Sequence, residues 1–104
     1  MSGFAHAYVH RDSIGDRTAC ERHLDEAEPL IDRLHAAGRI TGYQLLLVGD
    51  DLEARDELVL TTRVEPVTGG HFPYVYTRVQ PTEGIDVDLD AFMDRLGYTR
   101  VDPG

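Results

Sequence analysis

Residues 4–10 read Phe-Ala-His-Ala-Tyr-Val-His, and this stretch decides how the fold of the chain is interpreted. Side chains alternate between the two faces of a β-strand, so the larger ones share one face and the small aliphatic ones share the other. The first set is Phe4, His6, Tyr8 and His10, and the second is Ala5, Ala7 and Val9. Because small side chains let a helix pack closely against a strand, we expect the second set to face the helices.

A long helical pattern follows this strand. Asp16 is placed to cap the helix, because a carboxylate there accepts hydrogen bonds from the first free amide groups. Apolar side chains then recur every three or four residues and predict one buried stripe, made of Cys20, Leu24, Ala27, Ile31 and Leu34. Pro29 predicts a kink or a restart, since proline lacks the amide hydrogen. Gly38 is placed to end the helix.

The rest of the chain predicts further strands and a second helix. The predicted strands are Thr41–Val48, Leu58–Val64 and Phe72–Val79, with a short last strand over Tyr98–Val101. A turn is predicted over Pro66–Gly70, where glycine supplies positive φ. Asp88 is predicted to cap a helix over Leu89–Leu96, which Gly97 ends. Phe92 and Leu96 belong to the predicted buried face of this helix, together with Leu89 and Met93.

The order of these elements predicts an α+β fold. Two helices pack on one face of a mostly antiparallel sheet of four to five strands, as a ferredoxin-like sandwich or a close variant. The split βαβ unit of that sandwich accounts for the first strand, the first helix and the second strand, whereas the extra strand leaves the strand order open. The length of 104 residues predicts that residues 1–104 form a single α+β domain.

The composition is strongly acidic, with 19 acidic against 10 basic residues and a formal charge of −9. All basic residues are arginine. This charge argues against nucleic acid and anionic membranes as partners. It is typical of a salt-rich cytoplasm, a biased genome composition or a surface that engages a basic partner. Cys20 is the only cysteine, and no signal peptide or membrane span is apparent, so we expect a cytoplasmic protein.

The histidines and acidic clusters do not match a metal-binding pattern. His6 and His10 lie about 13 Å apart along a strand, which is too far for both to bind one zinc ion. The acidic residues between Asp50 and Glu57 do not have the spacing of a calcium-binding loop. Gly69-Gly70 does not open a helix, as a phosphate-binding loop would. We therefore predict no metal and no cofactor.

The candidate site is the larger-residue face of the first strand, with the face of the third strand that carries Tyr74, Tyr76 and Arg78. The candidate binding or interface residues are Phe4, His6, Tyr8, His10, Tyr74, Tyr76 and Arg78. We expect a small acidic interaction protein, an adaptor or inhibitor that binds another macromolecule, and a homodimer paired through this face or a protein partner, basic in one interpretation. The alternative is a small-molecule-binding or cofactor-independent enzyme domain with a pocket over the same face. No catalytic residue is assigned.

Overall fold

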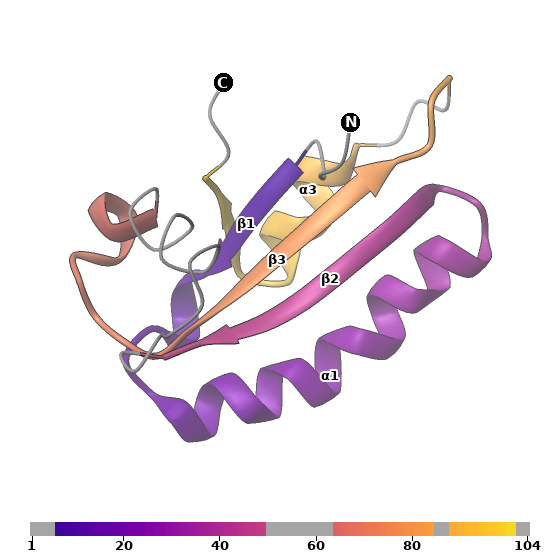
Figure 1. Ribbon diagram of the computed structural model, residues 1–104. Helices are drawn as coiled ribbons and strands as arrows, with labels where there is room; N and C mark the ends of the chain where they lie inside the picture. The colour runs from indigo at the N-terminus through magenta and orange to yellow at the C-terminus, as the bar shows by residue number, and fades with distance from the viewer. Residues whose placement is uncertain (1–5, 50–63, 85–87, 102–104) are drawn as a thin grey trace.

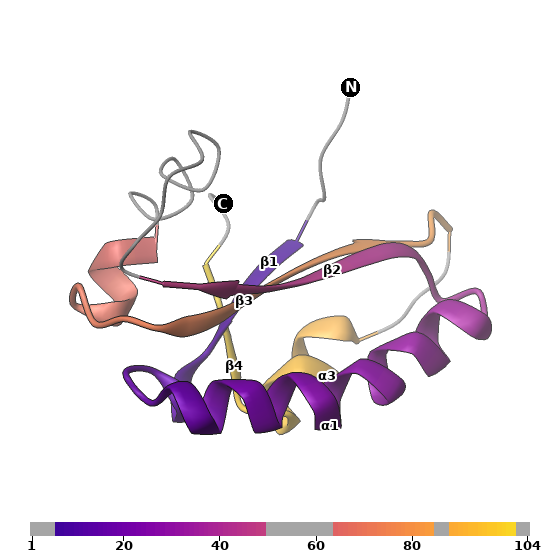
Figure 2. The same cartoon turned by 60° about the horizontal axis from the view of Figure 1, so that its bottom comes forward.

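The computed structural model describes residues 6–49, 64–84 and 88–101, and in them a four-stranded antiparallel sheet carries two helices on one face (Figures 1 and 2). The strands are β1 (His6–His10), β2 (Ile40–Val48), β3 (Tyr74–Pro81) and β4 (Tyr98–Arg100). The helices are α1 (Arg17–Ala36) and α3 (Leu89–Arg95), and a 3-10 turn, η1 (Arg11–Ser13), joins β1 to the segment before α1. The predicted α+β class is confirmed.

The strand order is β2-β3-β1-β4, and each neighbouring pair is antiparallel. β3 therefore lies between β1 and β2, and α1 makes the crossover that connects those two strands. This arrangement brings the start of β1, the end of β3 and the start of α3 to one end of the sheet. The more specific name, a ferredoxin-like sandwich, stays an interpretation of this strand order.

Helix α1 forms as predicted at both ends but is not interrupted at Pro29. The side chain of Asp16 accepts a hydrogen bond from the amide of Ala19 at 3.1 Å, and Gly38 follows the helix with φ of +76°. The predicted restart as a second helix is wrong, because α1 is continuous through Pro29. Pro29 lies on the exposed side, where water can bind the carbonyl group that loses its partner. The buried Ala27 and Ile31 on either side hold the helix on the sheet.

The segment before β3 differs from the prediction. Most of the predicted strand Leu58–Val64 lies outside the described residues, and Val64 itself is helical, as are the other residues of 64–68. The predicted turn over Pro66–Gly70 is wrong in its first half, because residues 66–68 are helical. Gly69 and Gly70 then adopt positive φ, as predicted. β3 begins directly after Pro73.

The two faces of β1 are reversed relative to the prediction. Tyr8 packs on the helical side, in a core with residues of α1 and α3. Ala7 and Val9 lie in a second core on the other face, which also contains Val64. Burial therefore does not distinguish the faces, because both are covered. The helical side requires the larger residue, since the Tyr8 side chain reaches across to α3 and donates a hydrogen bond to Asp90.

Candidate functional site

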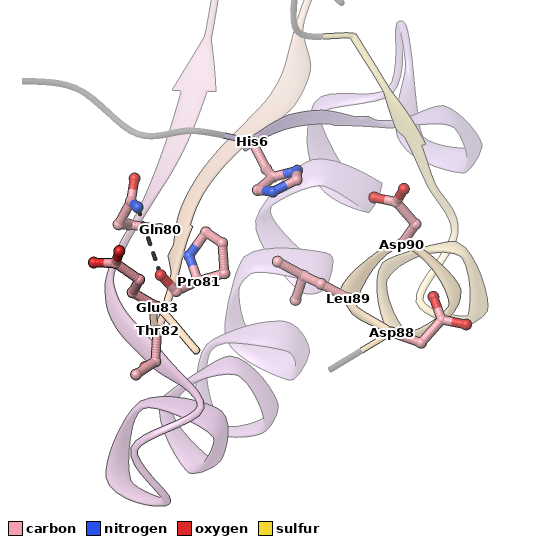
Figure 3. Close-up of a pocket in the computed structure, with 8 residues that line it drawn as sticks. All are labelled: His6, Gln80, Pro81, Thr82, Glu83, Asp88, Leu89 and Asp90. Carbon is pink, nitrogen blue, oxygen red and sulfur yellow. Dashed lines mark hydrogen bonds between the residues drawn. The ribbon is translucent and has the colours of Figure 1, made fainter. Parts of the chain in front are cut away.

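A pocket of about 430 Å³ lies at the end of the sheet where β1 begins, β3 ends and α3 begins (Figure 3). Its lining comes from three separate parts of the chain: His6 from β1, a group at and after the end of β3, and a group at the start of α3. The second group is Gln80, Pro81, Thr82 and Glu83, and the third is Asp88, Leu89 and Asp90. The pocket therefore depends on the fold and not on any local motif.

His6 stands between the two sides of the pocket, with the β3 group on one side and the α3 group on the other (Figure 3). Its ring is nearly parallel to that of Tyr8, with 14° between the planes and 6.4 Å between the centroids. The Nδ1 atom is buried and has no hydrogen-bond partner among the described residues. Nε2 is thus the ring nitrogen that a molecule in the pocket can reach.

Asp90 is held in place by two neighbours. The hydroxyl group of Tyr8 donates to Oδ1 at 2.7 Å, and Nη1 of Arg100 lies 3.0 Å from Oδ2. The hydrogen bond from Tyr8 is the main reason why the pKa of Asp90 is lowered, and Arg100 acts in the same direction. Asp90 consequently presents a fixed, ionised carboxylate at the pocket.

The charge of the pocket lining is negative. Glu83, Asp88 and Asp90 contribute carboxyl groups, and the described lining contains no arginine. Arg100, next to the lining, offsets only the charge of Asp90. Asp88 also caps α3, because its Oδ1 accepts a hydrogen bond from the amide of Ala91 at 3.1 Å. Pro81 and Leu89 provide apolar surface in the middle of the pocket (Figure 3). This lining suits a small molecule with a positively charged end and a short apolar part.

His10 belongs to a different group of residues, at the opposite end of β1. Its ring is stacked on that of His23 from α1, with centroids 3.5 Å apart, and both histidines are buried. His23 Nε2 lies 2.6 Å from the hydroxyl group of Tyr98, and His10 Nδ1 lies 2.7 Å from Oγ of Ser13. We call His10, His23, Tyr98 and Ser13 the histidine cluster.

The structure separates the residues that the sequence predicts as one site. His6 lines the pocket, Tyr8 binds the pocket residue Asp90, and His10 lies in the histidine cluster. Phe4 is outside the described residues.

The predicted third-strand residues do not share the face of His6, Tyr8 and His10. Tyr74 and Tyr76 pack in the core on the other side of the sheet. Arg78 lies on that side as well, and donates a hydrogen bond to Gln44.

The register between β1 and β3 explains this separation. Tyr8 is paired with Thr77, and Val9 is paired with Tyr76. Because directly paired residues in a sheet share a face, the tyrosines of β3 lie with Ala7 and Val9. The prediction of one continuous aromatic surface is therefore wrong. Tyr8 is 1% exposed, Tyr74 0% and Tyr76 4%, so these aromatic side chains are covered within the chain itself.

Several site residues were missed by the sequence analysis. His23 lies three residues after Cys20 and four before Ala27, so its place on the buried stripe was available from spacing alone. Tyr98, Asp90 and the β3 group gave no such signal, because only the tertiary structure brings them to His23 and His6. Within the described ranges, no group of three or more histidine, cysteine, aspartate or glutamate residues is arranged to hold a metal ion.

The described helices include none that is long and apolar enough to cross a membrane. No protein-family model, curated protein or solved structure matches this chain.

Proposed function

We propose that the protein binds a small molecule with a positively charged group in the pocket between β1, β3 and α3. The observation that carries this proposal is the pocket itself, whose volume of about 430 Å³ lies within the range of small-molecule sites, roughly 300–1,000 Å³. The negative lining favours an amine or a guanidinium group over a carboxylate. We assign binding only, and no catalytic residue.

Each part of the lining has a separate role in this proposal. Asp90 provides the carboxylate for the cation, and the hydrogen bond from Tyr8 keeps it ionised and correctly placed. Nε2 of His6 is available for a hydrogen bond to a polar group of the ligand. Pro81 and Leu89 contact the apolar part. The formal charge of −9 also raises the local concentration of cations near the protein.

The experiment is a binding titration with propylamine, propylguanidine and propionate, followed by amide chemical shifts. We expect the two cations to shift residues around the pocket and propionate to leave them unchanged. His6→Ala and Asp90→Asn should each weaken cation binding about tenfold. Asp25→Asn makes the same charge change as Asp90→Asn at an exposed position of α1 outside the pocket and serves as the control. Equal binding of propionate, or equal losses in Asp25→Asn and Asp90→Asn, would contradict the proposal.

A second candidate is the acidic interaction protein predicted from the sequence, which binds another macromolecule in the cytoplasm. The charge of −9 and the exposed acidic side chains of α1, including Glu21, Asp25 and Asp32, favour a basic protein as its partner. Binding of a polyarginine peptide should fall steeply between low salt and about 1 M salt. Binding that is unchanged over this range would contradict an electrostatic partner.

The homodimer was predicted to pair through the aromatic residues of the first and third strands. This argument no longer supports a dimer, because Tyr8, Tyr74 and Tyr76 are buried within one chain. Leu30 and Val67 are the only exposed large hydrophobic side chains among the described residues. A dimer formed through the described part of the surface would therefore use mostly polar side chains. Sedimentation of the protein at several concentrations tests whether one forms.

A further inference from the structure

The histidine cluster lies where β1, α1 and β4 meet, at one corner of the molecule. His10 ends β1, His23 lies on α1, and Tyr98 begins β4. The rings of His10 and His23 are 12° from parallel at 3.5 Å, and Tyr98 meets both of them edge-on. Each histidine is 8% exposed. The corner is thus held by two imidazole rings in direct contact, with little access for water.

Each ring of the pair also makes a hydrogen bond to a hydroxyl group. Thr77 donates to the hydroxyl oxygen of Tyr98 at 2.8 Å, which leaves the hydroxyl hydrogen of Tyr98 for Nε2 of His23. His10 Nδ1 lies 2.7 Å from Oγ of Ser13. A proton added to either ring would place a positive charge on a buried imidazole whose stacked neighbour lies only 3.5 Å away.

The rings cannot slide apart to make room for a charge. A β-carbon placed on Gly97 would lie 2.8 Å from Nε2 of His10, so the backbone of Gly97 closes one side of that ring and His23 covers one face. Gly97 in turn accepts a hydrogen bond from the amide of Arg11 at 2.9 Å. Separation of the two rings requires η1 and the turn at residues 96–97 to move away from α1.

The charged groups around the cluster do not offset the burial of the rings. Asp12 and Arg11 face it from η1 with opposite signs, Glu26 faces it from α1, and Asp94 pairs with Arg11. The pKa of His23 is lowered to about 4, mainly by burial; the neighbouring His10 acts in the same direction, and Asp12 acts in the opposite one. Burial also lowers the pKa of His10, although Asp12 and the Leu96 carbonyl act in the opposite direction. Both rings thus resist protonation while the corner is closed.

We propose that the stacked His10–His23 pair is an acid-sensitive latch, and that its protonation releases η1 and the turn at residues 96–97 from α1 while the sheet stays folded. The open corner binds protons at ordinary histidine affinity, whereas the closed corner excludes them. Acid therefore favours the open state, as in other switches that depend on buried histidines.

Cys20 reports directly on this opening. Its thiol is fully buried in the closed corner and donates to the carbonyl oxygen of Ser13 at 3.2 Å. We would measure the labelling rate of Cys20 with 4,4′-dithiodipyridine, relative to a cysteine peptide, as the pH is lowered from 6.5 toward 4.5. The normalised rate should rise at least about tenfold. Below pH 6.5, each histidine raises the population of the open state relative to the closed state by up to tenfold per pH unit. Far-UV circular dichroism should stay constant over the same interval.

Two non-titrating variants separate the latch from acid effects elsewhere. His23→Gln and His10→Asn each keep an acceptor near the original nitrogen but cannot bind a proton, so each should flatten the pH dependence of labelling. His71→Gln removes an exposed histidine outside the cluster and should keep the full dependence. If a cluster variant does not fold, Tyr98→Phe is the substitute. It removes the hydrogen bond that Tyr98 and His23 make in the closed corner, and should therefore move the opening to higher pH.

The outcomes against the latch are equally specific. A normalised labelling rate that does not change with pH would overturn it. Loss of circular dichroism in parallel with labelling would show that the pair only contributes to global stability. Full pH dependence in both His23→Gln and His10→Asn would place the titrating group elsewhere in the protein.

Discussion

Tyr8 and Asp90 are 82 residues apart in the chain, yet the hydroxyl group of Tyr8 lies 2.7 Å from Oδ1 of Asp90. Tyr8 is buried between the sheet and the helices, while Asp90 lies at the surface in the first turn of α3. The bond therefore connects the core to the pocket. It places a carboxylate at the pocket edge without burying its charge.

Tyr8→Phe removes the hydroxyl group that makes this bond and keeps the aromatic ring. We expect a loss of about 1 kcal/mol in the free energy of unfolding, measured with urea, because one end of the bond is exposed. The pKa of Asp90 should rise toward its ordinary value, as seen in a carboxyl ¹³C titration. Tyr43→Phe is the matched control, because Tyr43 donates to Asp32 on the exposed surface at 3.2 Å. A larger loss in Tyr43→Phe than in Tyr8→Phe would contradict this account.

Ile31→Ala tests the buried stripe of α1. Ile31 is 0% exposed and belongs to the core between α1 and the sheet, so its truncation should cost about 2–5 kcal/mol of unfolding free energy. Leu30, the next residue, is 36% exposed, and Leu30→Ala should cost under about 1 kcal/mol. Urea unfolding of both variants gives the comparison. Similar losses in the two would mean that α1 packs with a different face.

Stability should fall in mild acid because of the histidine cluster. A group whose pKa is lower in the folded protein binds fewer protons there than in the unfolded chain, so its stabilising effect is complete above pH 6.5 and decreases below it. For His23, whose pKa falls from 6.5 to about 4, the loss between pH 6.5 and 5 is about 2 kcal/mol. Urea unfolding at pH 7 and pH 5 measures it. His23→Gln should remove most of the difference, and an unchanged difference would exclude His23 as its source.

Gly97→Ala should be far more damaging than the same change at Gly38. Both glycines have positive φ, +95° and +76°, so each variant carries a backbone cost of about 1 kcal/mol. At Gly97 the new β-carbon would also meet His10 and Asp12 at under 3 Å, whereas Gly38 has open space. We expect Gly97→Ala to cost at least about 2 kcal/mol more in thermal or urea unfolding. Equal losses of unfolding free energy in the two variants would show that His10 and Asp12 can move to make room for the new β-carbon.

The melting temperature should rise with salt. At a formal charge of −9 the folded chain repels itself, and ions screen this repulsion. Differential scanning calorimetry from low salt to about 1 M KCl tests the effect. A flat or falling curve would mean that self-repulsion contributes little to stability.

Local signals in the sequence predicted the helices well. Asp16 and Asp88 cap α1 and α3 as expected, because an N-cap depends only on residues within one turn. The apolar spacing placed Cys20, Ala27 and Ile31 in the core, with Leu24 and Leu34 packed against it. Pro29 was misjudged because tertiary packing outweighs one lost hydrogen bond on the solvent side.

The candidate site was only partly predictable. His6 was named from the sequence and lines the pocket, but the other lining residues come from β3 and α3, and their positions depend on strand order and on the β1–β3 register. Neither follows from periodicity within one strand. Alternation alone placed His6, Tyr8 and His10 on one face, but it could not say which face meets the helices.

That alternation gives β1 an unusual sensitivity to changes in length. Its helix-facing positions hold, in order, a pocket residue, the anchor of Asp90 and one half of the stacked pair: His6, Tyr8 and His10. Inserting or deleting one residue between His6 and His10 would turn one of these ends toward the opposite face of the sheet. A substitution changes one of these positions and leaves the others in place, whereas a change in the number of residues between them alters the face on which they lie. Among chains that descend from a common ancestor with this one, we therefore expect length variation in the connections and a constant spacing in β1.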